Sequence, residues 1–168
     1  MGLHKKCMNL EFGRFNLLSI IKLEILLTNN NCDYKIITHD TPIISTQDAA
    51  EYFDINKAAP TFIIDTDKGL ISLIISSRQN KIDFKAMKNE LGFSKFRMAD
   101  REKVRELTGY NVGTIPLVGH NLPTIFDNRL LEHDYIYGGT GSELHTLMIA
   151  PGDIIRLNND IQILNRNK

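Results

Sequence analysis

The stretch Ala59–Ser76, APTFIIDTDKGLISLIIS, decides the fold. It contains two short, β-branched, apolar segments, 60–65 (PTFIID) and 70–76 (LISLIIS). The polar, glycine-ended sequence 66–69 (TDKG) separates them. Two strand-like segments around such a turn predict a β-hairpin.

Upstream of this hairpin the pattern is partly helical. Apolar residues recur at helical spacing from Phe15 to Leu27, and the asparagines at 29–31 end that helix. A strand is expected over 34–38. Ser45 and Asp48 resemble a capping box, which predicts a helix from Thr46 to about Phe53.

Downstream, helices give way to strands. Asp83 is expected to cap a helix that runs through Glu90, and a short strand should follow over 95–98. Asp100 should cap the next helix, which Gly109 ends. The remaining expected elements are strands over 115–118, 124–126, 135–137 and 144–149 and a short helix over 153–157.

These elements predict one α/β (α+β) domain with a mixed, barrel-like sheet. A doubly wound fold is disfavoured, because the C-terminal strands follow one another without helices. We assign 1–14 to an N-terminal extension, 15–158 to the domain and 159–168 to a C-terminal tail. A chain of 168 residues is long enough to bury one sizeable core without a metal or a disulfide.

Charge and cysteine content limit the nucleic-acid partners and the cellular setting that the sequence predicts. Twenty basic residues balance twenty acidic ones, so an RNA partner would need a local basic patch, and DNA is not expected. Lys22 and Glu24 interrupt the most apolar early stretch, so no membrane span is expected there. Two cysteines without a CxxC pair fit a reduced, cytoplasmic setting.

Basic residues are concentrated in the middle third of the chain. They are interleaved with Asp and Glu, so they fit either a solvated face or an RNA-facing patch. They are Lys81, Lys85, Lys88, Lys95, Arg97, Arg101, Lys103 and Arg105.

Two glycine-rich loops are the main candidates for a binding site. The first, 108–120, reads TGYNVGTIPLVGH, and the second, 137–145, reads YGGTGSELH. Glycines let backbone N–H groups approach a ligand closely, and His145 adds a polar side chain that could act on an ester. Taken singly, each loop fits a structural turn better than a binding loop, and His145 fits a half-buried strand residue.

Other catalytic signatures are missing from the sequence. No GxSxG elbow or cysteine–histidine signature supports a covalent mechanism, and His39 beside Asp40 fits a loop better than a dyad. The five histidines lack the spacing of a zinc site. We therefore expect neither a metal nor a cofactor.

The order of these pieces resembles the YbaK and prolyl-tRNA-synthetase-associated editing family. The similarity covers roughly Leu17 to Leu157 and rests on APTFIIDTDKGLISLIIS, ELTGYNVGTIPLVG and YGGTGSELH in this order. It implies a mixed β-barrel surrounded by helices. It also implies a deacylase that hydrolyses small amino acids, such as alanine or cysteine, from mischarged tRNA, commonly tRNA for proline.

The resemblance also implies roles for single residues. Gly141 to His145 has the family's Gly-x-x-x-His form, so His145 would shape the aminoacyl pocket and Gly113 would lie against the amino-acid end of the substrate. The implied catalytic set is His145, Gly113 and Gly141, and the implied substrate-binding set is Lys57, Thr61, Pro116, Gly139 and Thr140. Water would attack the ester while backbone amides stabilise the oxyanion.

One position departs from the family pattern. Family deacylases commonly carry a lysine directly before the threonine of the first hairpin strand, where this chain has Pro60 before Thr61. Lys57 would replace that lysine only if its loop folds back. Because the chain shows no adenylation or anticodon-binding segment, we expect action in trans on aminoacyl-tRNA, with a synthetase as a further candidate partner. The alternative is a catalytically weak binding module for an amino acid, a nucleotide, tRNA or a synthetase.

Overall fold

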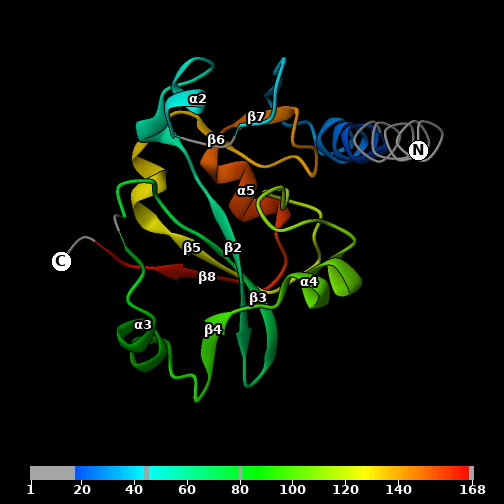
Figure 1. Ribbon diagram of the computed structural model, residues 1–168. Helices are drawn as coiled ribbons and strands as arrows, with labels where there is room; N and C mark the ends of the chain where they lie inside the picture. Colours follow the sequence, from blue (N-terminus) through cyan, green and yellow to red (C-terminus); the bar gives the residue numbers. More distant parts are fainter. Residues whose placement is uncertain (1–17, 44–45, 80, 167–168) are drawn as a thin grey trace.

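The computed structural model describes residues 18–43, 46–79 and 81–166 (Figure 1). The strands are β1 (Tyr34–Thr38), β2 (Thr61–Thr66), β3 (Gly69–Ile74), β4 (Phe96–Met98), β5 (Thr124–Asp127), β6 (Ile136–Gly138), β7 (His145–Ile149) and β8 (Ile161–Leu164). The α-helices are a helix over 18–29, α2 (Thr46–Ala50), α3 (Phe84–Leu91), α4 (Arg101–Thr108) and α5 (Pro151–Leu157). Two 3-10 helices are η1 (Ile55–Lys57) and η2 (Asn128–Glu132).

The strands form two sheets, and the larger is built on the predicted hairpin. Its order is β4-β2-β3-β5-β8, with β2 and β3 antiparallel and β3, β5 and β8 parallel. Thr66 pairs with Gly69, so Asp67 and Lys68 alone form the turn. The smaller sheet, β1-β7-β6, is antiparallel. The predicted mixed α/β architecture is therefore confirmed.

The two sheets meet where β2 begins. Ala58 forms an isolated parallel bridge with Tyr137 of β6, and the Ala59 N–H donates to the Tyr137 carbonyl at 2.8 Å. Figure 1 shows α2, β6 and β7 at one end of the molecule and the β2–β3 turn at the other. The bridge thus holds the small sheet against the end of the hairpin that lies far from its turn.

Helices cover the larger sheet on both faces. Met87 of α3 packs against Ile64, Ile71 and Phe96 on one face, and Val104 of α4 packs against Ile63 on the other. A third cluster joins the smaller sheet to the helix over 18–29, α5 and β5; its members include Leu23, Leu27, Phe126, Leu147, Ile149 and Ile154. Burying these apolar side chains is the main source of stability.

The predicted caps of α3 and α4 are confirmed. The Asp83 carboxylate accepts from Ala86 N–H, and the Asp100 carboxylate accepts from the N–H groups of Glu102 and Lys103. Gly109 ends α4 with φ of 78°, a left-handed conformation that favours glycine. Ser45 of the predicted capping box lies outside the described residues.

Other boundaries differ from the prediction. Residues 115–118 do not form a strand, because the Leu117 N–H donates to the Gly139 carbonyl and the preceding Thr114 carbonyl accepts from the Gly141 N–H, in place of a strand ladder. α2 ends at Ala50, before the expected Phe53. The segment 159–168, assigned to a tail, supplies β8, which pairs with β5 in the larger sheet.

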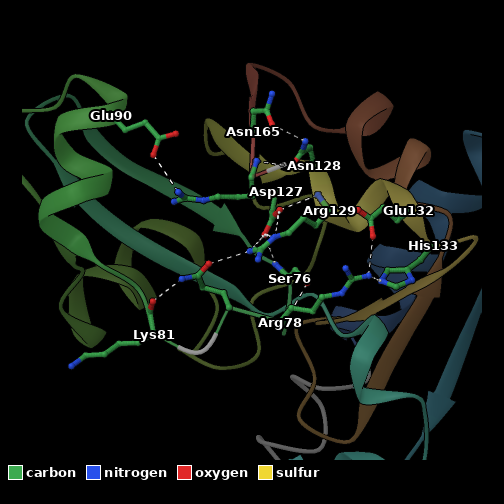
Figure 2. Close-up of polar contacts among 12 residues, drawn as sticks. Ser76, Arg78, Lys81, Glu90, Asp127, Asn128, Arg129, Glu132, His133 and Asn165 are labelled. Carbon is green, nitrogen blue, oxygen red and sulfur yellow. Dashed lines mark hydrogen bonds and ion pairs between the residues drawn. The ribbon is translucent and has the colours of Figure 1, made fainter. Parts of the chain in front are cut away.

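A buried ion pair fixes the ends of β3 and β5 (Figure 2). The fully buried Asp127 carboxylate accepts from the Ser76 N–H at 2.9 Å and from the Arg129 guanidinium at 2.6 Å. Burial opposes ionisation of Asp127, but these hydrogen bonds outweigh it and lower the pKa of the carboxyl group. The parallel strands are therefore held together at their carboxyl ends.

A second buried polar chain crosses the larger sheet. His120 Nδ1 accepts from the Leu122 N–H at 3.1 Å, and its Nε2 lies 3.3 Å from Ser72 Oγ, which contacts Thr124 Oγ1 at 2.8 Å. A backbone N–H can only donate, so Nδ1 is unprotonated and the imidazole is neutral. Burial lowers the pKa of His120 to about 4.

The buried His120 should make folding stability depend on pH. Between about pH 6.5 and about pH 4 the unfolded chain binds a proton at His120 and the folded chain does not. As the pH is lowered through this range, the contribution of His120 to the free energy of unfolding therefore decreases, by at most about 3 kcal/mol. The difference between the urea-unfolding curves of the wild type and His120→Asn isolates this contribution. A constant difference from pH 7 to pH 4.5 would contradict it.

Candidate functional site

A cavity of about 930 Å³ lies between the two sheets. Its wall is formed by the end of β1, α2 and η1, the start of β2, the start of α4, the loop 112–115 and the segment 137–146. This volume is in the range of sites that hold a small ligand. Both glycine-rich loops contribute to the same cavity.

The structure brings half of the predicted site residues to this cavity. The residues that line it are His145, Gly113, Thr61 and Gly139. Those that do not are Gly141, Lys57, Pro116 and Thr140. Pro116 and Thr140 line a second, smaller cavity of about 340 Å³ beside the helix over 18–29, and Lys57 lies in η1. Pro60, at the position of the family lysine, is exposed and lines the larger cavity.

Close backbone contact holds the two glycine loops together. The Leu117 N–H donates to the Gly139 carbonyl at 3.1 Å, and the Gly141 N–H donates to the Thr114 carbonyl at 2.7 Å. A Cβ atom at Gly139 would overlap the Ile115 carbonyl oxygen. Gly141 has φ of 89°, and a Cβ there would meet the Tyr110 ring. Glycine is therefore required at both positions for the loops to approach.

A network of short hydrogen bonds holds His145 at the start of β7. Its Nδ1 lies 2.7 Å from Ser142 Oγ, which also accepts from the Leu144 N–H at 3.2 Å. Thr140 Oγ1 donates to the His145 carbonyl at 3.1 Å and accepts from the Ser142 N–H at 3.1 Å. Burial lowers the pKa of His145, so its imidazole is neutral near pH 7.

His39, which the sequence analysis interpreted as a loop residue beside Asp40, lines the cavity. It is 4% exposed, and its Nε2 lies 2.9 Å from Thr146 Oγ1. Burial lowers the pKa of His39, and the neighbouring His145 lowers it further. The two histidines meet because β1 pairs with β7, with Thr38 opposite His145. No local pattern around His39 indicates this long-range pairing.

The cavity has few charged side chains. Among the described residues that line it, Arg101 is the one Lys or Arg and Glu143 the one carboxylate. Arg101 is exposed at the first position of α4. A cation at the mouth of a cavity favours an anionic group of the ligand there.

Three further cations, from the segment 95–103, share one carboxylate. Asp65 of β2 is almost fully buried, and its oxygens lie 3.2 Å from Lys95 Nζ, 3.5 Å from an Arg97 terminal nitrogen and 3.3 Å from Lys103 Nζ. The Arg97 side chain is 70% exposed. The four basic side chains of 95–103, which are Lys95, Arg97, Arg101 and Lys103, all reach solvent and make up the cationic surface of this segment.

The structure also bears on metal binding and on membrane insertion. Within 18–43, 46–79 and 81–166, no group of three or more His, Cys, Asp or Glu side chains could hold a metal ion. No helix in this part of the chain has the length and apolar character needed to cross a membrane.

Fold and site together define a single-domain α/β protein whose two glycine loops and a histidine enclose one cavity. The chain belongs to the aminoacyl-tRNA editing domain family, whose model matches residues 40–157. The fold is similar to that of a candidate trans-editing enzyme for prolyl-tRNA synthetase, with TM-score 0.75 and 22% identity, covering 88% of this chain and 95% of that one. It is also similar to the hypothetical protein APE2540, with TM-score 0.72 and 24% identity, covering 84% and 97%.

The contact between the two loops predicts a sharp difference among glycine substitutions. Gly139→Ala should lower the free energy of unfolding by about 1–3 kcal/mol or more, because the new methyl group overlaps the Ile115 carbonyl oxygen. Gly152→Ala in α5, where a Cβ meets nothing within 4 Å, is the matched control and should be neutral or stabilising. Urea unfolding of both variants checks this. Equal effects would show that the contact does not matter.

Proposed function

We propose that this protein is a trans-acting deacylase that hydrolyses the ester of mischarged tRNA, specifically tRNA for proline carrying a small amino acid such as alanine or cysteine. The observation that carries the proposal is the meeting of Gly113, Gly139 and His145 in one cavity of a member of the editing family. The similarity to a candidate trans-editing enzyme for prolyl-tRNA synthetase supports both the substrate and action in trans.

The chemistry needs little beyond the cavity itself. Gly113 and Gly139 have no side chains, so the backbone can lie against the reacting ester. Neutral His145 can form a hydrogen bond with the substrate without placing a positive charge beside the α-ammonium group. Water then attacks the ester carbonyl carbon. Backbone amides stabilise the oxyanion of the tetrahedral intermediate, and the tRNA hydroxyl leaves.

The need for such an activity follows from small differences in binding. One methylene changes the binding of an amino acid by only about 1–3 kcal/mol, so a synthetase alone discriminates weakly between small side chains. A second site with a different shape removes the wrong product. Apolar residues of the wall, Ile55, Ala59 and Ile63, are suited to select by size.

We assign the anionic end of the substrate to the mouth with Arg101. The phosphates nearest the esterified ribose would contact Arg101, and the acceptor stem would continue over Lys95, Arg97 and Lys103. This assignment replaces Lys57, which does not line the cavity, as the cation that compensates for Pro60.

The second candidate function is that of a binding module with little turnover. Pro60 favours it, because the position next to Thr61 carries no ammonium group. Such a module would bind the acceptor end of tRNA, or a synthetase that carries it, without hydrolysis.

Deacylation of labelled tRNA tests the leading proposal. Purified protein should release alanine or cysteine from tRNA for proline faster than proline from the same tRNA, and His145→Ala should lower kcat by about 100-fold, because it removes a polar contact to the reacting ester. Turnover of neither mischarged tRNA, with retained tRNA binding, would favour the binding module. No turnover and no binding would exclude both.

A pair of arginine variants on α4 tests the assigned phosphate end. Arg101→Ala should weaken tRNA binding about tenfold and reduce the slope of log affinity against log salt by about one, since one phosphate contact is lost. Arg105→Ala, the same change one turn later and away from the cavity, is the control. A larger effect of Lys57→Ala than of Arg101→Ala would return the role to Lys57.

A further inference from the structure

Within the second glycine loop, the side chain closest to the His145 ring is that of Ser142. The Ser142 Oγ to His145 Nδ1 distance is 2.7 Å, and Ser142 is 3% exposed. The proposed deacylation leaves open whether His145 gives a proton to the substrate or takes one from water. The hydrogen-bond partners of Ser142 decide this.

The hydroxyl proton of Ser142 has one acceptor. Ser142 Oγ accepts from the Leu144 N–H at 3.2 Å, because a backbone N–H can only donate. In the described residues, the remaining partner of this oxygen is His145 Nδ1. Directing the proton elsewhere would leave a buried donor unsatisfied, which costs about 1–3 kcal/mol. The proton therefore points at Nδ1.

The tautomer of His145 follows from this arrangement. When Nδ1 accepts, a neutral imidazole carries its hydrogen on Nε2. No hydrogen bond to Nε2 of His145 occurs within the described residues, and His145 lines the cavity. The nitrogen that a ligand can reach is thus a donor.

We propose that Ser142 is a positioning residue that fixes the Nε2–H tautomer of His145, so that His145 donates a hydrogen bond to the substrate ester and does not act as the base. The role at the ester rests on the proposed function, whereas the tautomer is a property of the protein alone. The Nε2–H is placed to bind the oxygen that becomes negative when water adds to the carbonyl carbon. The proton of the attacking water passes to the departing ribose oxygen, and the neighbouring ribose hydroxyl can relay it by giving up its own proton as it accepts one.

The same structure provides an internal reference. His120 Nδ1 accepts from the Leu122 N–H, so His120 has the same Nε2–H tautomer for an independent reason. The two histidines should therefore give the same pattern of nitrogen signals.

Nitrogen-15 NMR of protein labelled at the histidine rings tests the assignment at pH 7.5. In the wild type, His145, identified by the signals lost in His145→Asn, should show a bare Nδ1 and a protonated Nε2, like His120. Ser142→Ala should give a mixture of tautomers, and Ser142→Thr should restore one form. Ser77→Ala, which removes another cavity hydroxyl, bonded to the Ile55 carbonyl, should leave the His145 signals unchanged. A protonated Nδ1 in the wild type would overturn the proposal without any variant.

Kinetics separate this proposal from the proposed function. Ser142→Ala should lower kcat about tenfold with little change in KM, and Ser142→Thr should recover most of it. An unchanged kcat in Ser142→Ala would overturn the role of Ser142 in hydrolysis while the deacylase proposal stands. A wild type that shows the Nε2–H tautomer but hydrolyses no aminoacyl-tRNA would overturn the deacylase proposal and confine the inference to the tautomer.

Discussion

The backbone contact between Gly139 and Ile115 is the constraint on which the site depends. This contact joins the two glycine-rich loops, 108–120 and 137–145, and it leaves no room for a side chain at residue 139. Through it, the loop that carries Gly113 and the loop that carries His145 form one wall. The bridge between Ala58 and Tyr137 joins the start of β2 to the second of these loops. The part of the cavity wall that the two loops form is irregular in itself but is fixed by a few backbone hydrogen bonds.

Local sequence was sufficient where local chemistry determines structure. The hairpin of β2 and β3 and the caps Asp83 and Asp100 depend on neighbouring residues, and the structure confirms them. The strand expected over 115–118 was wrong because the Leu117 N–H bonds to a loop carbonyl, that of Gly139. The IQIL segment 161–164, between Asp160 and Asn165, gave no sign that it pairs with β5.

The candidate site was only partly predictable, because some of its residues come together through long-range contacts and not through local sequence. Gly113, Gly139 and His145 lie in glycine-rich loops that the sequence makes visible, and the family resemblance assigned all three to one substrate site. The structure places them in the same cavity. His39 and Arg101 enter through the pairing of β1 with β7 and the position of α4, which no local pattern indicates. Lys57 is close in sequence to Pro60, but it does not line the cavity, although Ile55 of the same 3-10 helix does.

Asp65 orders the basic side chains of the cationic surface in advance of any ligand. A single buried carboxylate holds Lys95, Arg97 and Lys103 in place, so their side chains lose less conformational freedom on meeting a polyanion. The whole chain has no net charge, so bulk RNA is not drawn to it from a distance. Attraction to an anionic ligand therefore acts only over the short range of these side chains, whose arrangement is set before the ligand arrives.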